Sequence, residues 1–136
     1  MNDITYFNKA RDASRLSDYS KQHIGCVVVY KRHVISVGFN SNKTHPIQKL
    51  YNKERFDSDS TPHSLHAEIT ALLFLKDRKD IKWSDVELYT YRENKRGELR
   101  MSKPCKSCMA LIKDLGINKV HFTINDGYDE LEVKDA

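Results

Sequence analysis

The sequence lacks a long apolar run, a secretory leader and enough cysteine for a disulfide framework. No apolar run approaches the roughly 20 residues that a membrane-spanning helix needs, so we predict no membrane segment. The start of the chain has neither the basic end nor the apolar stretch of a signal peptide. Its three cysteines cannot all pair, and together these absences predict a cytoplasmic, reducing setting.

The composition is that of a soluble globular protein, with 39% hydrophobic and 31% charged residues. We find no repeat, low-complexity segment or internal boundary, and we predict a single domain over residues 1–136. A chain of this length can bury most of its apolar surface without disulfides or a structural metal. Any metal that it binds is therefore free to be functional.

The net charge of +4 suits an anionic ligand without requiring a nucleic-acid polymer. Basic residues crowd two stretches in the middle of the chain, 43–55 and 92–106, whereas residues 126–135 are mostly acidic. An acidic end of this kind would repel a polynucleotide that passed over it. The charge pattern favours a small anionic partner, and we keep nucleic acid as an alternative.

Apolar residues recur with helical spacing in some segments and form short β-branched runs in others. The predicted helices cover residues 3–18, about 67–76 and 104–116, and the predicted strands cover 25–30, 33–38, 86–91 and 119–124. The last helix is bounded by Pro104, which a first helical turn tolerates, and by Gly116, which is favoured just past a helix end. Helices that alternate with strands after an initial hairpin predict an α/β fold with a mixed sheet and helices on its faces.

Two segments do not fit this alternation. Residues 39–65 show no sustained period and predict a long loop or a partly ordered insertion, and loops of that length are usually functional or mobile. Lys95, Arg96 and Gly97 predict the turn of a small hairpin within residues 92–103. That hairpin leads into a pair of cysteines and lies where it could cover a pocket.

Cys105 and Cys108 form a clamp of two thiolates. Residues three apart lie on the same face of a helix, so both sulfurs can reach one ion while Lys106 and Ser107 point away. The first turn of a helix favours negative charge and so lowers the pKa of a thiol. A Cys-x-x-Cys pair alone is also typical of a structural clip or a redox pair, so its meaning depends on a further ligand.

The string His66-Ala67-Glu68 supplies that ligand together with a carboxylate. Two residues of regular helix rotate by about 200°, which would send His66 and Glu68 to opposite sides. We therefore expect His66 at or just before the start of the second helix and Glu68 in its first turn. His66, Cys105 and Cys108 make three ligands, whereas structural zinc normally takes four, so one position is left for water.

This donor set predicts an enzyme with one catalytic zinc ion as its cofactor. Zinc lowers the pKa of bound water to about 7, and a neighbouring carboxylate, here Glu68, can take a proton from that water and deliver it elsewhere. The combined pattern of His-x-Glu followed by Pro-Cys-x-x-Cys is the signature of zinc nucleobase deaminases. We expect attack on the amino-bearing carbon of a nucleobase, C4 if the base is cytosine, and release of ammonia.

With these residues in place, most of the chain resembles the cytidine and deoxycytidylate deaminase superfamily. The likeness rests on residues 25–29 leading to Gly38-Phe39-Asn40, on residues 66–68, and on residues 104–108 followed by Gly116-Ile117. The resemblance implies a three-layer α/β/α sandwich around a mixed, about five-stranded sheet, and self-association into a homo-oligomer. It also implies that Asn40 contacts the sugar of the substrate and that the backbone at Ala67 reads the base.

Within this superfamily, the Gly-Phe-Asn placement and the long loop look most like deoxycytidylate deaminases of phage or bacterial type. That likeness predicts a nucleotide-metabolism hydrolase that converts dCMP to dUMP. Those enzymes usually carry glycine where this chain has Ser41, and their strand usually runs almost directly into Pro-Cys, where this chain has residues 92–103. Both departures concern the substrate rather than the reaction.

Alternatives to this reading stay open. The same chemistry could act on a polymer, either adenosine in transfer RNA or single-stranded cytosine, or on another free nucleoside or nucleobase. A non-enzymatic zinc module that binds a nucleotide would have no need of Glu68. Asn40 could merely cap or turn the chain, and we expect Cys26 to be a packed small apolar residue.

Overall fold

The computed structural model describes residues 3–18, 22–41 and 66–135. The helices are α1 (Asp3–Ser14), α3 (Ala67–Leu72) and α4 (Lys106–Leu115), and short 3-10 turns lie at Trp83–Asp85 and Val133–Asp135. The strands are β1 (His23–Tyr30), β2 (His33–Phe39), β3 (Val86–Glu93), β4 (Lys119–Ile124) and β5 (Gly127–Glu132). Most of the loop predicted over 39–65 lies outside the described residues.

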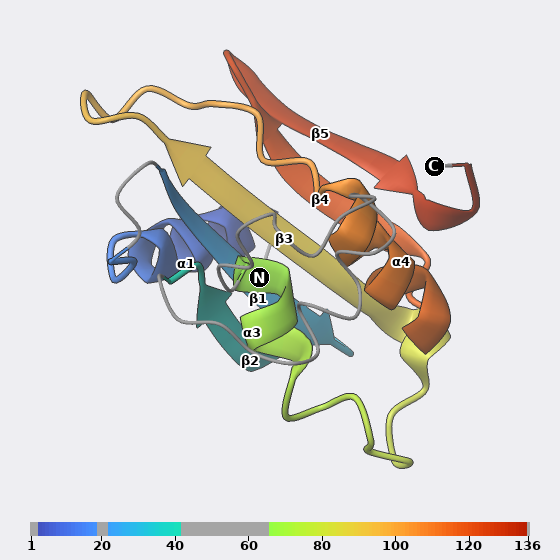
Figure 1. Cartoon of the computed structure of the whole chain (residues 1–136). Coiled ribbons are helices and arrows are strands. Elements are labelled where there is room, and N and C mark those ends of the chain that lie inside the picture. The colour runs from blue at the N-terminus through green and yellow to red at the C-terminus, as the bar shows by residue number, and fades with distance from the viewer. Residues whose placement is uncertain (1–2, 19–21, 42–65, 136) are drawn as a thin grey trace, which may run out of the picture.

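The five strands form one sheet in the order β2-β1-β3-β4-β5 (Figure 1). β1 pairs antiparallel with both β2 and β3, β3 runs parallel to β4, and β4 pairs antiparallel with β5. A parallel pair needs a crossover connection, and α4 provides it between β3 and β4. The prediction of a mixed sheet of about five strands is confirmed.

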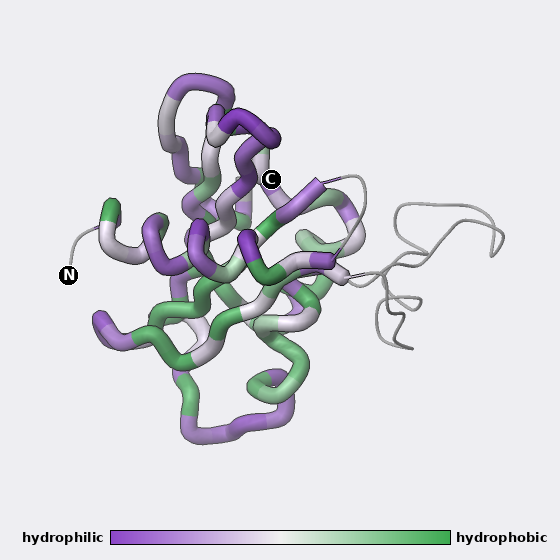
Figure 2. Tube along the Cα trace, turned by 90° about the vertical axis from the view of Figure 1, so that its left-hand side faces the viewer, coloured by the Kyte–Doolittle hydropathy of each residue, from purple (hydrophilic) through white to green (hydrophobic). Residues whose placement is uncertain are grey.

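Helices cover both faces of the sheet. α1 lies on one face, and α3 and α4 lie on the other, so the layers are α/β/α as predicted (Figure 1). The core on the α1 face contains Tyr6, Phe7, Ala10, Val27, Val29, Tyr89 and Tyr91. The core on the opposite face includes Cys26, Val28, Ile69, Leu72, Leu88 and Ile112. Successive residues of a strand point to opposite faces, so β1 and β3 contribute side chains to both cores. Figure 2 shows the hydrophobic stretches in the middle of the molecule.

Two glycines allow the helices to approach β1 and β2 closely. A Cβ atom at Gly25 would lie 1.9 Å from the carbonyl oxygen of Ala10 in α1. On the opposite face, a Cβ atom at Gly38 would lie 2.6 Å from the carbonyl oxygen of Ala67 at the start of α3. Both contacts are too short for any side chain, so glycine is required where each helix crosses its strand. Gly38 thereby fixes how close the first turn of α3 comes to the sheet.

The connection between β1 and β2 confirms the predicted hairpin. Lys31 and Arg32 have φ values of 50° and 68°, which places both in the left-handed region. Two left-handed residues are the geometry of a type I′ turn, whose twist matches that of the strands that it joins. Neither residue is the usual glycine or asparagine, so this turn carries some backbone strain.

Several elements differ from the prediction. Residues 127–132, read from the sequence as part of an acidic end, form the edge strand β5, because Leu131 pairs with Val120 while the charged residues face solvent. α4 begins at Lys106 rather than Pro104, and α1 and α3 are shorter than expected. No helix in the described ranges is long and apolar enough to cross a membrane.

The predicted hairpin after β3 is also present. Asn94 forms its turn by accepting the N–H groups of Arg96 and Glu98 at its Oδ1 atom, each at 2.9 Å. Gly97 has a φ of 80°, a left-handed conformation that favours glycine at this position. The side chain of Asn94 and the backbone of Gly97 therefore fix the turn.

The returning arm of this hairpin lies between β3 and β4. The Arg100 N–H donates to the carbonyl of Arg92 in β3 at 2.9 Å, and the Ser102 N–H donates to the carbonyl of Thr123 in β4 at 3.0 Å. The arm thus occupies the space where the parallel pair β3 and β4 stops being hydrogen-bonded directly. The chain continues from this arm directly to Cys105, at the start of α4.

Candidate metal centre

His66 lies at the N-terminus of α3, as the residue spacing predicted. It is the N-cap of the helix, with an extended backbone (φ −84°, ψ 156°), and Glu68 follows in the first helical turn. The N-cap backbone is not helical, so the 200° rotation that regular helix would impose between these residues does not apply. Both side chains can therefore face the same point.

Cys105 and Cys108 lie at the N-terminus of α4. Cys105 is the N-cap, with φ −70° and ψ 171°, and Cys108 is three residues further on in the first turn. The helix ends at Gly116, whose φ of 93° is the left-handed conformation of a helix C-terminus, as the sequence indicated. The two thiols thus lie at the start of a helix that begins after Cys105 and ends at Gly116.

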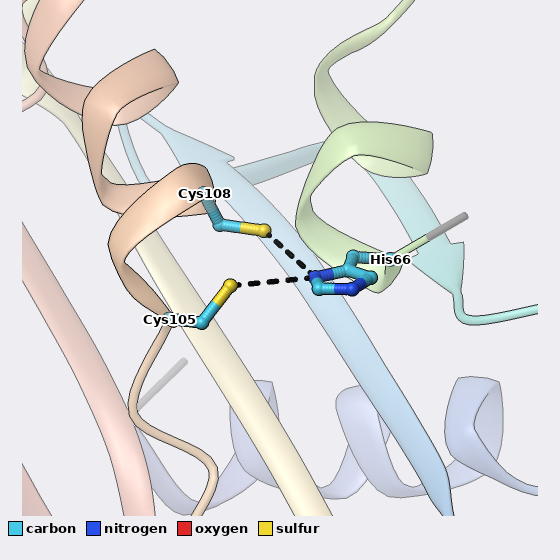
Figure 3. A group of neighbouring side chains, drawn as sticks. All are labelled: His66, Cys105 and Cys108. Atoms are coloured by element: carbon cyan, nitrogen blue, oxygen red, sulfur yellow. Dashed lines mark hydrogen bonds between the residues drawn. The ribbon is translucent and has the colours of Figure 1, made fainter. Parts of the chain in front are cut away.

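The three predicted ligands converge (Figure 3). Nδ1 of His66 lies 3.2 Å from Sγ of Cys108 and 3.5 Å from Sγ of Cys105. All three ligand atoms lie within 4.8 Å of one another. Tetrahedral zinc with ordinary Zn–N and Zn–S bonds would set each nitrogen–sulfur separation at about 3.6 Å. The donor set and its spacing therefore fit one zinc ion.

The two thiols differ in proton affinity. The pKa of Cys105 is lowered to about 3, first by the hydrogen bond from Cys108 and then by hydrogen bonding and charge from His66. The pKa of Cys108 is raised, first because its thiol donates to Cys105 and then because it is buried. Ser107 adds to this asymmetry, since its hydroxyl lies 3.1 Å from Sγ of Cys105.

The position of Ser107 corrects the prediction that it points away. A helical wheel starting at Cys105 places Ser107 on the far side, but Cys105 is the cap and has a non-helical backbone. Ser107 is fully buried beside the Cys105 sulfur, whereas Lys106 is exposed as expected. A hydroxyl that donates to a metal-bound thiolate stabilises its negative charge.

Glu68 is buried next to the ligand cluster, with 4% of its surface exposed. Burial raises the pKa of Glu68, and the charge of His66 together with a hydrogen bond from Cys108 partly offsets that increase. A carboxyl group in contact with the Cys108 thiol lies beside any ion that the three ligands hold. A raised pKa suits a group that must both accept and donate a proton near neutral pH.

Asn40 is buried at the end of β2 and binds the protein itself. Its Oδ1 atom accepts the N–H of Ile24 at 2.9 Å and lies 2.6 Å from the hydroxyl of Ser17, and its Nδ2 atom donates to the carbonyl of Gln22 at 2.8 Å. These contacts fix the orientation of the amide. Within the described part of the chain, the second Nδ2 hydrogen has no partner.

Ala67 is buried at the first residue of α3, between the ligand His66 and the carboxylate Glu68. Its carbonyl faces Gly38, so its backbone is held against the sheet. The structure therefore brings Ala67 next to the candidate metal centre and places Asn40 two residues beyond Gly38 on the same strand end.

Three buried hydroxyl groups that the sequence did not single out hold the approach to Cys105. The Ser102 hydroxyl donates to the carbonyl of Thr90 at 3.0 Å and accepts the N–H of Thr123 at 2.8 Å. Thr90 in turn donates to the carbonyl of Ser102 at 2.8 Å. No motif marks these residues, because each is an ordinary serine or threonine whose partners lie on three separate segments.

Comparisons with known proteins agree with this geometry. The family model of the cytidine and deoxycytidylate deaminase zinc-binding region matches residues 1–124. Among curated proteins, no sequence matches the chain.

Solved structures of deaminases have a similar fold at low sequence identity. Cytidine deaminase from Burkholderia pseudomallei has a TM-score of 0.67 and 16% identity, over 99% of this chain and 95% of that one. dCMP deaminase from the cyanophage S-TIM5, in its apo form, has a TM-score of 0.61 and 23% identity, over 90% and 84% of the two chains. Cytidine deaminase from Mycobacterium leprae has a TM-score of 0.57 and 18% identity, over 96% and 93%. The fold is thus cytidine deaminase-like, and the chain belongs to the zinc-dependent cytidine and deoxycytidylate deaminase family, with His66, Cys105 and Cys108 as the zinc site typical of that family.

Proposed function

We propose that this protein hydrolytically deaminates a cytosine nucleotide, dCMP to dUMP, and releases ammonia. The observation that carries the proposal is the buried carboxyl of Glu68 in contact with a three-ligand zinc site. A structural zinc site would use a fourth protein ligand and would have no use for a buried acid. In contrast, a deaminase needs a water position and a group that moves protons.

Glu68 is the residue that we assign to proton transfer. When bound, zinc supplies an activated water and Lewis acidity at this position. Glu68 accepts one proton from the attacking water and delivers it to the ring nitrogen. It then takes the remaining proton of the added hydroxyl and delivers it to the amino group, so that the C–N bond breaks and ammonia leaves. Its burial beside Cys108 keeps the carboxyl out of bulk water and within reach of both events.

We assign substrate binding to Asn40 and to the backbone at Ala67. The hydrogen bonds to Ile24 and Gln22 fix the orientation of the Asn40 amide. Its other Nδ2 hydrogen, which has no partner among the described residues, points to a contact with a sugar hydroxyl. The backbone of Ala67 lies between His66 and Glu68, which suits contact with the base that reacts there. Both assignments place the substrate across the ends of β1 and β2.

The choice of dCMP rests on the Gly38-Phe39-Asn40 block, on the net positive charge and on the fold shared with a phage dCMP deaminase. A phosphorylated substrate suits a chain with clusters of basic residues at 43–55 and 92–106. The cytidine deaminases with a similar fold make free cytidine the nearest competing substrate.

The test is a substrate panel on zinc-loaded protein, with ammonia release and ultraviolet absorbance as readouts. The panel contains cytidine, deoxycytidine, CMP, dCMP, dCTP and a cytosine-containing oligonucleotide. We expect the highest kcat/KM for dCMP, and no turnover by Glu68→Ala that still holds one zinc per chain. Turnover of the oligonucleotide alone would show that the substrate is a polymer rather than dCMP. Activity of zinc-loaded Glu68→Ala would contradict the role of Glu68 in proton transfer.

A further inference from the structure

A basic cavity of about 400 Å³ opens at the end of the sheet where β1 begins and β3 ends. Arg15 at the end of α1, His23 at the start of β1, and Arg92, Glu93 and Lys95 at the end of β3 all line it. Glu93 pairs with His23 in the β1–β3 ladder and lies on the α1 face with Tyr91, whereas Arg92 points to the opposite face. The cavity therefore reaches around the end of the sheet towards the layer that contains the zinc ligands.

Among the described residues that line this cavity, Glu93 is the only carboxylate, and its charge is already neutralised. One oxygen of Glu93 accepts Nε of Arg15 at 3.0 Å, and the other accepts the hydroxyl of Tyr91 at 2.9 Å. Arg92 and Lys95 form no ion pair with any described residue, so their charges are not balanced within the cavity. The cavity thus presents excess positive charge and suits an anion.

Hydrogen bonds within the protein hold the backbone segment that carries Arg92 and Lys95. The Arg92 N–H donates to Oγ1 of Thr123 at 3.2 Å, and its carbonyl accepts the N–H of Arg100. The Asn94 N–H donates to the carbonyl of Glu98 at 2.9 Å and closes the turn that holds Lys95. Cations on a preorganised segment bind an anion at a smaller entropic cost than cations on a loose loop.

The cavity and the strand position beneath the zinc site are three residues apart along β1. Cys26 of β1 is in register with Gly38, which lies under the carbonyl of Ala67 at the zinc site. His23 is three residues earlier in β1, about 10 Å along an extended strand. Gln22, which also lines the cavity, accepts the Nδ2 hydrogen bond of Asn40, so the cavity and the proposed sugar contact share a wall.

We propose that this cavity binds the phosphate group of a nucleotide, with Arg92 and Lys95 as its principal contacts. Arginine can bind phosphate with two parallel hydrogen bonds, and lysine adds a mobile point charge. The phosphate belongs either to the molecule whose base lies at zinc, a source that rests on the proposed function, or to a second nucleotide. The binding of phosphate itself does not depend on which reaction the zinc site performs.

The test measures binding to the zinc-loaded full chain at constant ionic strength, by calorimetry, with inorganic phosphate, dUMP and deoxyuridine as probes. The pocket variant is Arg92→Gln with Lys95→Gln, and the control is Lys9→Gln with Lys79→Gln, two exposed lysines outside the cavity that give the same change in net charge. We expect dUMP and phosphate to bind at least tenfold more weakly to the pocket variant and equally to the control. Lys95→Gln alone, at an exposed hairpin position, should lose part of the affinity without any effect on folding.

Equal dUMP affinity in the pocket variant and the wild type would overturn the proposal, as would an equal loss in the control. Kinetics then identify the source of the phosphate. A tenfold fall in the ratio of kcat/KM for dCMP to that for deoxycytidine would assign the cavity to the substrate's own phosphate, whereas an unchanged ratio with weakened dUMP binding would assign it to a second nucleotide. If the wild type turned over neither compound, the proposed function would be refuted. The binding of inorganic phosphate to the wild type and the pocket variant would still test whether the cavity is a phosphate site.

Discussion

Replacing Ser102 with alanine tests whether the buried hydroxyl groups hold the zinc site in place. Ser102 is 5% exposed, and Thr90 and Thr123 are fully buried. The substitution removes one oxygen, which leaves the Thr123 N–H without its acceptor at 2.8 Å and removes the hydrogen bond to the Thr90 carbonyl. A buried donor left unpaired costs about 1–3 kcal/mol, and a lost hydrogen bond costs about 1 kcal/mol. We expect the free energy of unfolding to fall by about 3 kcal/mol in urea denaturation of the zinc-loaded protein.

The same variant should lose zinc faster, because Ser102 anchors the segment that ends three residues later at Cys105. Transfer of zinc to a chromophoric chelator measures that rate, and we expect an increase of at least fivefold. The control is Val29→Ala, a buried residue on the α1 face whose truncation costs about 2–3 kcal/mol far from the ligands. Equal rates of zinc loss in the two variants would show that Ser102 acts only through overall stability, and a loss below 1 kcal/mol would refute the hydrogen-bond accounting.

Three further changes test other parts of the structure. Glu68→Gln should retain one zinc per chain by metal analysis and lose about 10²- to 10⁴-fold in kcat, because a neutral amide cannot carry the proton. Gly25→Ala should destabilise the fold by about 3 kcal/mol or more in thermal unfolding, because its Cβ would lie 1.9 Å from the Ala10 oxygen, whereas Gly127→Ala, with nothing within 4 Å, should be nearly neutral. Burial and the hydrogen bond to Glu93 raise the pKa of Tyr91 to about 12, above its value in the unfolded chain, so stability should fall as pH rises from about 10 to 12, and this fall should be smaller in Tyr91→Phe.

The zinc ligands could be predicted from sequence because their spacing is set by local backbone geometry. Cys105 and Cys108 are three apart at one helix start, and His66 and Glu68 can share a side only if one of them precedes the helix, which is what the backbone at His66 shows. Strands β1 and β4 could be predicted because burial leaves a pattern in the sequence. β1 contributes to both cores and is a continuous β-branched run, whereas apolar and polar residues alternate in β4.

Features that depend on contacts between residues far apart in the sequence could not be predicted. The edge strand β5 buries few residues, so its acidic sequence resembles a solvated tail, and only pairing with β4 makes it a strand. Ser107 was misplaced because the sequence does not reveal that Cys105 is a cap rather than a helical residue. The cavity at the end of the sheet brings together residues 15, 23 and 92–95, and no local pattern links these positions.

The zinc site draws its geometry from two helix starts that lie on separate connections, so each start must be fixed independently. Gly38 fixes α3, because only glycine lets the carbonyl of Ala67 lie against β2. Ser102 fixes α4, because its hydrogen bonds hold the returning arm between β3 and β4 just before Cys105. Neither device involves a ligand atom, so the separations of 3.2 and 3.5 Å from His66 to the two sulfurs follow from the packing of the chain itself. The metal affinity of the site therefore depends on residues that never touch the metal.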